Sequence, residues 1–186
     1  MFDRRGSRKY LNGAERRAFL RAVMNEPSTA RQAFCLTLLY TGCRISEALN
    51  LTGERIDMAD KAITFETLKR RRGGYFRAVP IPGSLATLLG ELLNKGNLSS
   101  RVWNFSRATG YRLVKEHMAG AGVTGGMACP KGLRHGVAVA CLAEKIPLPT
   151  VQKWLGHARL ETTAIYLDVQ GQEERALAQR LWRAST

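Results

Sequence analysis

The sequence lacks the long apolar runs that a membrane protein or a secreted precursor would need. Its longest apolar stretches, around residues 34–40 and 137–143, are too short to cross a bilayer. The first five residues are mostly charged and no apolar region follows them, so nothing here has the pattern of a signal peptide. We therefore expect a cytoplasmic protein, associated with the nucleoid, that makes no contact with a membrane.

Cysteine and histidine are also scarce. The four cysteines contain no CxxC pair, and Cys35 and Cys141 lie within apolar helical patterns, which favours reduced core thiols over a disulfide framework. With only three histidines and no paired acidic motif, the sequence offers no evident metal site. A metal-dependent nuclease would need carboxylates to hold its ions. We expect no metal and no other cofactor, so the chemistry should come from side chains alone.

Acidic residues are outnumbered by basic ones. The 186 residues include 29 Lys and Arg but 15 Asp and Glu, which gives a formal net charge of +14. Such an excess is typical of proteins that bind the phosphate backbone of nucleic acids. An anionic membrane surface is the alternative, but the chain has no long basic amphipathic helix with bulky apolar anchors. The length corresponds to about one domain with its own core.

Hydrophobic periodicity predicts a mainly α-helical fold with a small antiparallel β-sheet, an α+β domain. Asn12 is suited to cap a first helix, and a second helix ends at Gly42, a residue suited to the left-handed C′ position. Between residues 56 and 81 the pattern alternates as in a β-hairpin. We assign residues 1–9 to a flexible basic tail and 10–186 to the domain. Later helices are predicted to begin at Pro82, near Ser106 and at Pro130.

The stretch from Lys131 to Tyr166 carries side chains suited to phosphoryl chemistry. Lys131, Arg134 and His135 are three and four residues apart, so on a helix they share one face. A tyrosine has a pKa of about 10, so a nucleophilic Tyr166 would need a proton acceptor and cations that stabilise the developing charge. Guanidinium groups fit phosphate best. Taken singly, each residue also has an ordinary explanation as a solvated side chain, a helix end or part of the core.

Taken together, four ordered segments resemble the tyrosine recombinase (phage integrase) family, whose members cut DNA by forming a phosphotyrosine link. One position departs from the family pattern, because Lys131 stands where the first histidine of His-x-x-Arg is expected. The likeness extends from about residue 10 to the end of the chain. The four segments are Thr-Gly-Cys-Arg-Ile-Ser-Glu at 41–47, Arg134-His135, Leu155-Gly156-His157, and Tyr166, nine residues after His157.

The resemblance implies catalytic roles for seven side chains and a supporting role for an eighth. An ordinary surface ion pair between Arg44 and Glu47, worth well under about 1 kcal/mol, is the alternative that we consider weaker. The implied roles are Tyr166 as nucleophile, Arg44 and Arg134 as the clamp on the phosphate, His157 as a further hydrogen-bond donor, His135 and Lys131 as assistants near the nucleophile, Lys69 as the acid for the departing 5′ oxygen, and Glu47 as the support of Arg44.

The same resemblance implies double-stranded DNA as the partner, bound by a homotetramer. The three arginines at 70–72 could instead belong to an ordinary solvated loop. The basic residues of the helix at about 106–119 could likewise form an ordinary solvent-exposed face. A C-terminal helix at about 172–184 would either complete the core or dock on a neighbouring protomer, and both interpretations stay open. The residues expected to contact DNA are Arg70, Arg71, Arg72, Arg107, Arg112 and Lys115.

The function implied is site-specific DNA recombination through a 3′-phosphotyrosyl intermediate, without metal or ATP. Two other classes stay open: a type IB topoisomerase-like enzyme that relaxes DNA, and a catalytically silent DNA-binding regulator on the same fold. Most family members carry a separate N-terminal helical domain. Because nothing before residue 10 could supply it, we expect either a catalytic fragment or a short recombinase that resembles the fimbrial phase-switching type.

Overall fold

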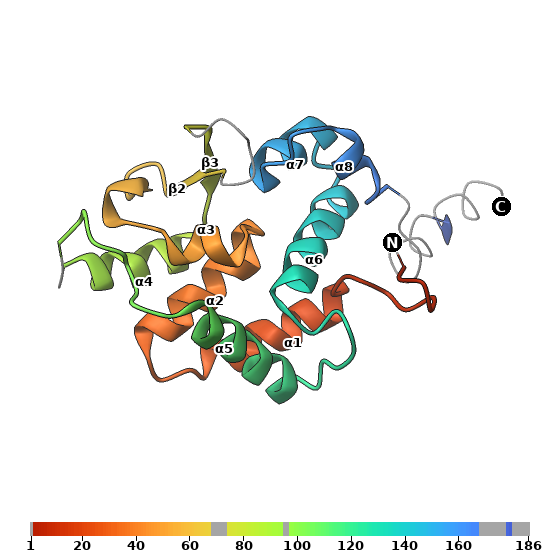
Figure 1. Ribbon diagram of the computed structural model, residues 1–186, viewed down its shortest axis with the longest axis horizontal. Coiled ribbons are helices and arrows are strands. Elements are labelled where there is room, and N and C mark those ends of the chain that lie inside the picture. Colours follow the sequence, from red (N-terminus) through yellow and green to blue (C-terminus); the bar gives the residue numbers. More distant parts are fainter. Residues whose placement is uncertain (1, 68–73, 95–96, 168–177, 180–186) are drawn as a thin grey trace.

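The computed structural model describes residues 2–67, 74–94, 97–167 and 178–179. Within them the chain forms a set of α-helices and one three-stranded antiparallel sheet (Figure 1), which confirms the predicted fold class. In chain order the elements are α1 (Gly13–Met24), α2 (Thr29–Thr41), α3 (Ile45–Leu49), the 3-10 turn η1 (Gly53–Arg55), β1 (Ile56–Asp57), β2 (Ala62–Glu66), β3 (Phe76–Pro80), α4 (Gly83–Leu93), α5 (Arg107–Gly120), α6 (Pro130–Ala143), α7 (Leu148–Leu155) and α8 (Glu161–Ala164).

The ends of the first two helices follow from their capping residues. At the start of α1, Asn12 and Glu15 form a capping box: the Asn12 side chain accepts from the Glu15 amide and the Glu15 side chain accepts from the Asn12 amide, both at 2.8 Å. At the end of α2, Gly42 adopts the left-handed conformation with φ of 61°. Both predicted positions are confirmed.

Helix α2 is the centre of the fold. It contacts α1, α3, α4, α5 and α6, and most of its side chains are buried (Figure 1). Its C-terminal end approaches two later helices closely, because a Cβ added at Gly42 would lie 2.9 Å from Leu155 of α7 and 3.1 Å from Val137 of α6. The chain that leaves α2 therefore enters α3 at the point where α6 and α7 also meet.

The sheet has the strand order β1-β2-β3 and lies beside α4 and α7 (Figure 1). The register pairs Ile63 with Val79 and Phe65 with Arg77. Alternate residues are buried along β2 and β3, as expected for a hairpin with one face on the core. Helix α7 packs against β3, so the sheet and the C-terminal helices are in direct contact.

A second, smaller group of buried residues joins the two ends of the described chain. Tyr10 and Tyr166 are almost completely buried and pack with residues of α6 and α7, namely Ala138, Val139, Val151 and Leu155. Tyr166 is thus held by apolar packing on its ring, and only its hydroxyl needs a polar partner.

Some predicted features lie outside the described residues. They include the segment 68–73, with Lys69, Arg70, Arg71 and Arg72, and the predicted helix at about 172–184 apart from residues 178 and 179. The flexible tail at 1–9 stays a prediction. Within the described part of the chain, no helix has the length and apolar character needed to cross a membrane.

Candidate active site

Six of the predicted catalytic side chains line a single pocket of about 500 Å³. They come from the start of α3, the first turns of α6 and the segments that follow α7 and α8. The convergence of α2, α6 and α7 near Gly42 explains why residues so distant in sequence meet here. The six are Arg44, Lys131, Arg134, His135, His157 and Tyr166.

The hydroxyl of Tyr166 lies 2.7 Å from Nδ1 of His135. Burial, with Lys131 and Arg134 nearby, lowers the pKa of His135 to about 4, so its ring is neutral at pH 7. Burial raises the pKa of Tyr166, while Arg134 and Arg44 oppose that rise, and the phenol keeps its proton. A neutral imidazole next to a protonated phenol is arranged to accept the phenol proton.

The ring of His157 stacks on that of Tyr166, with centroids 6.1 Å apart and 12° between the planes. Its Nδ1 lies 2.8 Å from Oγ1 of Thr163, a threonine that is fully buried. Burial, followed by the charges of Arg134 and Arg44, lowers the pKa of His157 to about 3. The ring is therefore neutral at pH 7, with one N–H to donate.

Arg134 is a buried cation bonded to the backbone. Its Nη1 donates to the carbonyl of Gly42 at 2.8 Å, and its Nη2 donates to the carbonyl of Leu155 at 2.6 Å. Burial and the neighbouring Arg44 lower the pKa of Arg134 to about 10, which leaves it charged at neutral pH. A guanidinium has five N–H donors, so donors remain for a ligand in the pocket.

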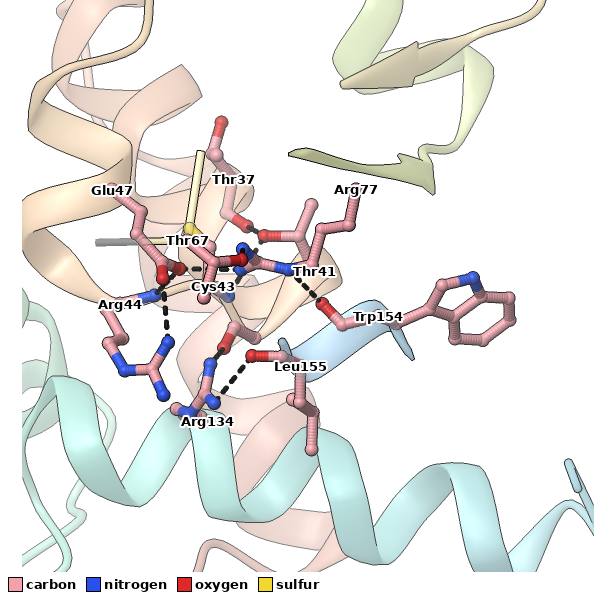
Figure 2. Close-up of polar contacts among 11 residues, drawn as sticks. Thr37, Thr41, Cys43, Arg44, Glu47, Thr67, Arg77, Arg134, Trp154 and Leu155 are labelled. Carbon is pink, nitrogen blue, oxygen red and sulfur yellow. Dashed lines mark hydrogen bonds and ion pairs between the residues drawn. The ribbon is translucent and has the colours of Figure 1, made fainter. Parts of the chain in front are cut away.

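Glu47 is a buried carboxylate that accepts hydrogen bonds from two arginines (Figure 2). Its Oε1 accepts from Nη1 of Arg44 at 2.7 Å, and its Oε2 accepts from the Arg44 amide at 2.8 Å and from Nη2 of Arg77 at 2.6 Å. Burial alone would raise the pKa of Glu47, but Arg77 and Arg44 together hold it below its usual value. The ionised carboxylate fixes the guanidinium of Arg44 at the pocket.

A model of the phage integrase family matches residues 9–173. The chain belongs to the phage integrase family. Tyrosine recombinase XerA of Pyrococcus furiosus is 34% identical to it over 161 residues, covering 81% of this chain and 54% of that protein. The crystal structure of XerA recombinase superposes with a TM-score of 0.77 at 25% identity, covering 92% of this chain and 64% of the other.

A XerH recombinase bound to palindromic difH substrate, in a post-cleavage complex, superposes with a TM-score of 0.74 at 26% identity. The superposition covers 94% of this chain and 53% of XerH. This integrase-family chain therefore spans about half the length of the curated relatives it matches. The family resemblance predicted from the motifs is confirmed, whereas the likeness to the short fimbrial type stays a prediction.

Of the six predicted catalytic residues that line the pocket, only Lys131, the one that departs from the family pattern, is exposed. Lys131 lines the pocket from the first turn of α6 but is exposed, whereas His135, one turn further on, contacts Tyr166. Arg107 also lines the pocket, from the start of α5. The other two basic residues predicted on that helix, Arg112 and Lys115, are exposed and lie beyond the pocket lining.

Three residues near the site were not singled out from the sequence. Arg77 is buried beneath the pocket, Thr163 contacts His157, and Tyr111, one turn after Arg107, is exposed in the pocket wall. The sequence did contain an indication that Arg77 is buried, because residues alternate between the two faces along β3 and Arg77 shares the buried face with Val79. No local pattern indicates Thr163, whose partner is six residues away across a turn.

Among the described residues, no three His, Cys, Asp or Glu side chains gather in a way that could hold a metal ion. Cys43 lies directly before Arg44 and is buried. Burial raises the pKa of its thiol to about 12, so the sulfur stays protonated and is not a nucleophile at neutral pH.

Proposed function

We propose that the chain is the catalytic domain of a site-specific DNA recombinase that cleaves and rejoins DNA through a 3′-phosphotyrosyl intermediate. One observation carries the proposal: the Tyr166 hydroxyl, 2.7 Å from a neutral His135, lines the same pocket as the guanidinium groups of Arg44 and Arg134. A nucleophile, a proton acceptor and two phosphate-binding cations thus share one pocket.

In the forward step, Oη of Tyr166 attacks the phosphorus and the bond from phosphorus to the 5′ oxygen breaks. The phenol proton passes to Nδ1 of His135, and the departing oxygen takes a proton from a general acid, for which we propose Lys69. Arg44 and Arg134 donate to the non-bridging oxygens. Because one phosphoester replaces another, the 5′ hydroxyl of a partner strand reverses the step without ATP.

Lys131 fits a supporting role better than that of the base. It is exposed at the pocket and surrounded by cations, while the phosphate that would bind there carries negative charge that favours the ammonium form. An ammonium group donates hydrogen bonds but cannot accept a proton. His135 then accepts the tyrosine proton, and Lys131 contributes a further donor to the phosphate.

Double-stranded DNA is the proposed substrate. The XerH structure similar to this chain holds its difH substrate, and Arg107, Arg112 and Lys115 extend the positive charge of the pocket along α5. Exchange of both strands between two duplexes requires four cleavages, so we propose a homotetramer on DNA. The segment at about 172–184 would then either complete its own core or dock on a neighbouring protomer.

The test is capture of a covalent adduct from a pool of nicked duplexes with a randomised centre. After cleavage next to a nick, the short fragment that carries the 5′ hydroxyl diffuses away and leaves the protein attached to the 3′ end. We expect denaturant-resistant adducts whose DNA shares one sequence. Tyr166→Phe should keep DNA affinity and fold but form no adduct, whereas Tyr40→Phe, which alters a tyrosine outside the pocket, should behave as the parent.

The same experiment separates the other two classes. Adducts with unrelated sequences, together with relaxation of a supercoiled plasmid, would favour the topoisomerase-like enzyme. DNA binding without any adduct would favour the silent regulator. Adducts that persist in Tyr166→Phe would overturn the assignment of the nucleophile.

A further inference from the structure

Arg77 lies on β3 and is completely buried outside the lining of the pocket. Its guanidinium uses all three nitrogens: Nε donates to the carbonyl of Trp154 at 2.8 Å, Nη1 to Oγ1 of Thr67 at 2.9 Å and Nη2 to Oε2 of Glu47 at 2.6 Å (Figure 2). These partners belong to α7, to the residue that directly follows β2 and to α3. One side chain thereby fixes three segments relative to one another.

Stability alone does not explain a charge at this position. Taking a guanidinium and a carboxylate out of water costs free energy that their mutual attraction often fails to recover, so an apolar pair of similar volume would serve a core equally well. The surroundings of Arg77 on this face of the sheet include Val79 and the ring of Phe65, whose centroid is 5.3 Å from Cζ. If packing were the only requirement, an apolar residue would suffice.

The contacts of Arg77 lead to two groups that line the pocket. Through Glu47 it reaches the guanidinium of Arg44. Through Trp154 it reaches the last turn of α7, after which the chain reverses at Gly156 and places His157. A Cβ added at Gly156 would lie 2.9 Å from Cζ of Arg77, so the end of α7 packs directly against this guanidinium.

Arg77 also determines the charge that Arg44 presents. The single negative charge of Glu47 contacts two guanidinium groups, of which Arg77 is completely buried and Arg44 is partly exposed. Because Arg77 neutralises the carboxylate from within the core, the three residues together leave one positive charge at the pocket. Without Arg77, Glu47 would neutralise Arg44 itself and weaken its attraction for a phosphate.

We propose that Arg77 is a positioning residue for DNA cleavage, which holds Arg44 and His157 on the same phosphate and keeps the charge of Arg44 available, without itself touching DNA. This inference rests on the proposed function. It adds to the reaction a residue that lies on the sheet and acts only through its partners.

Four variants separate positioning from packing. Arg77→Met removes the charge at similar length, and Arg77→Lys keeps the charge but has one nitrogen for three acceptors. Arg77→Met leaves the buried carboxylate of Glu47 without its buried partner, which could prevent folding. The double variant Arg77→Met/Glu47→Gln removes both buried charges and serves in that case. Arg31→Met is the control with the same change in net charge, because Arg31 pairs with Glu26 and Glu116 away from the pocket.

The first measurement is single-turnover cleavage of the duplex captured by the parent, with the dissociation constant measured separately. We expect Arg77→Met, or the double variant if Arg77→Met does not fold, to bind as Arg31→Met does but to cleave at least tenfold more slowly. Arg77→Lys should lie between them. Folded variants that cleave at the rate of Arg31→Met would overturn the proposal.

The second measurement needs no cleavage and uses inorganic phosphate as the probe. In the parent, the Nε–H signal of Arg44 and the imidazole nitrogen signals of His157 should shift on NMR titration with one common dissociation constant. In Arg77→Met, phosphate affinity should fall about tenfold and the two titrations should separate, while Arg31→Met matches the parent. In the double variant no carboxylate neutralises Arg44, so the two titrations should separate without that tenfold loss. Coincident, parent-like titrations would show that Arg77 only packs. A parent that forms no DNA adduct would overturn the proposed function, yet this titration would still decide the role of Arg77.

Discussion

At the scale of single residues, the hydroxyl of Thr163 is placed to decide which ring nitrogen of His157 carries the proton. The ring of His157 is neutral, since burial lowers its pKa to about 3, so only one of its nitrogens carries a proton. If the Thr163 hydroxyl, 2.8 Å away, donates to Nδ1, the proton must reside on Nε2. That tautomer gives the pocket a neutral N–H donor for a phosphate oxygen. We expect Thr163→Val to lower the single-turnover cleavage rate roughly 10- to 100-fold.

Thr163→Ser is the matched control, because it keeps the hydroxyl and should stay within a few-fold of the parent. Nitrogen-15 NMR of His157 gives a second measurement: the parent and the serine variant should show a protonated Nε2, and the valine variant a mixture of tautomers. A valine variant with the parent's rate and the parent's spectrum would contradict this role.

The residues of the site divide into those that a sequence motif can identify and those that depend on distant contacts. Arg44, Arg134, His157 and Tyr166 belong to short ordered motifs with fixed spacing, so they could be predicted. Arg77 could not be assigned a purpose in the same way. Its three partners are 10, 30 and 77 residues away in sequence, and only the folded chain brings them together.

At the scale of elements, the C-terminal end of α7 is a sharply constrained joint of the site. Gly156 ends the helix in the left-handed conformation with φ of 66°, and a Cβ there would lie 2.9 to 3.0 Å from three atoms of the Arg77 guanidinium. That guanidinium is held by three hydrogen bonds and cannot easily move aside. We expect Gly156→Ala to lower the free energy of unfolding by roughly 2 to 4 kcal/mol, from backbone strain and this contact together.

Gly122→Ala separates the two contributions. Gly122 has nearly the same φ, 69°, but a Cβ there would meet nothing within 4 Å, so its replacement should cost only the strain of about 1 to 2 kcal/mol. Urea unfolding of both variants measures the difference. Equal losses would mean that the guanidinium of Arg77 gives way at no cost.

The elements themselves were predictable where local chemistry determines them. The capping box of Asn12 and Glu15, the left-handed Gly42 and Pro130 at the start of α6 each set a helix end through neighbouring atoms. The packing between elements was not predictable in this way. The small core around Tyr10 and Tyr166 joins segments from opposite ends of the described chain, which no period or cap indicates.

At the scale of the whole molecule, the chain has a net charge of +14, and four of its cations, Arg44, Arg107, Lys131 and Arg134, line one pocket together with two histidines. Burial, then the neighbouring cations, lowers the pKa of His135 to about 4 and that of His157 to about 3, from an ordinary value of 6.5. In the unfolded chain both rings would bind protons below pH 6.5. Folding and proton binding at these two positions therefore oppose each other.

The expected consequence is a loss of stability on acidification. Between pH 6.5 and about 4 the unfolded state binds more protons than the native state, so the free energy of unfolding falls as the pH falls and recovers above pH 6.5. A buried histidine that stays neutral in the folded chain lowers the free energy of unfolding by up to about 1.4 kcal/mol for each pH unit of acidification. Partial contact with solvent reduces this slope to about 1 kcal/mol per pH unit for each ring. Urea unfolding at pH 7, 6 and 5 and constant salt should show this slope, and His135→Gln and His157→Gln should each flatten it. A slope unchanged in both variants would mean that folding does not lower the pKa of these two rings.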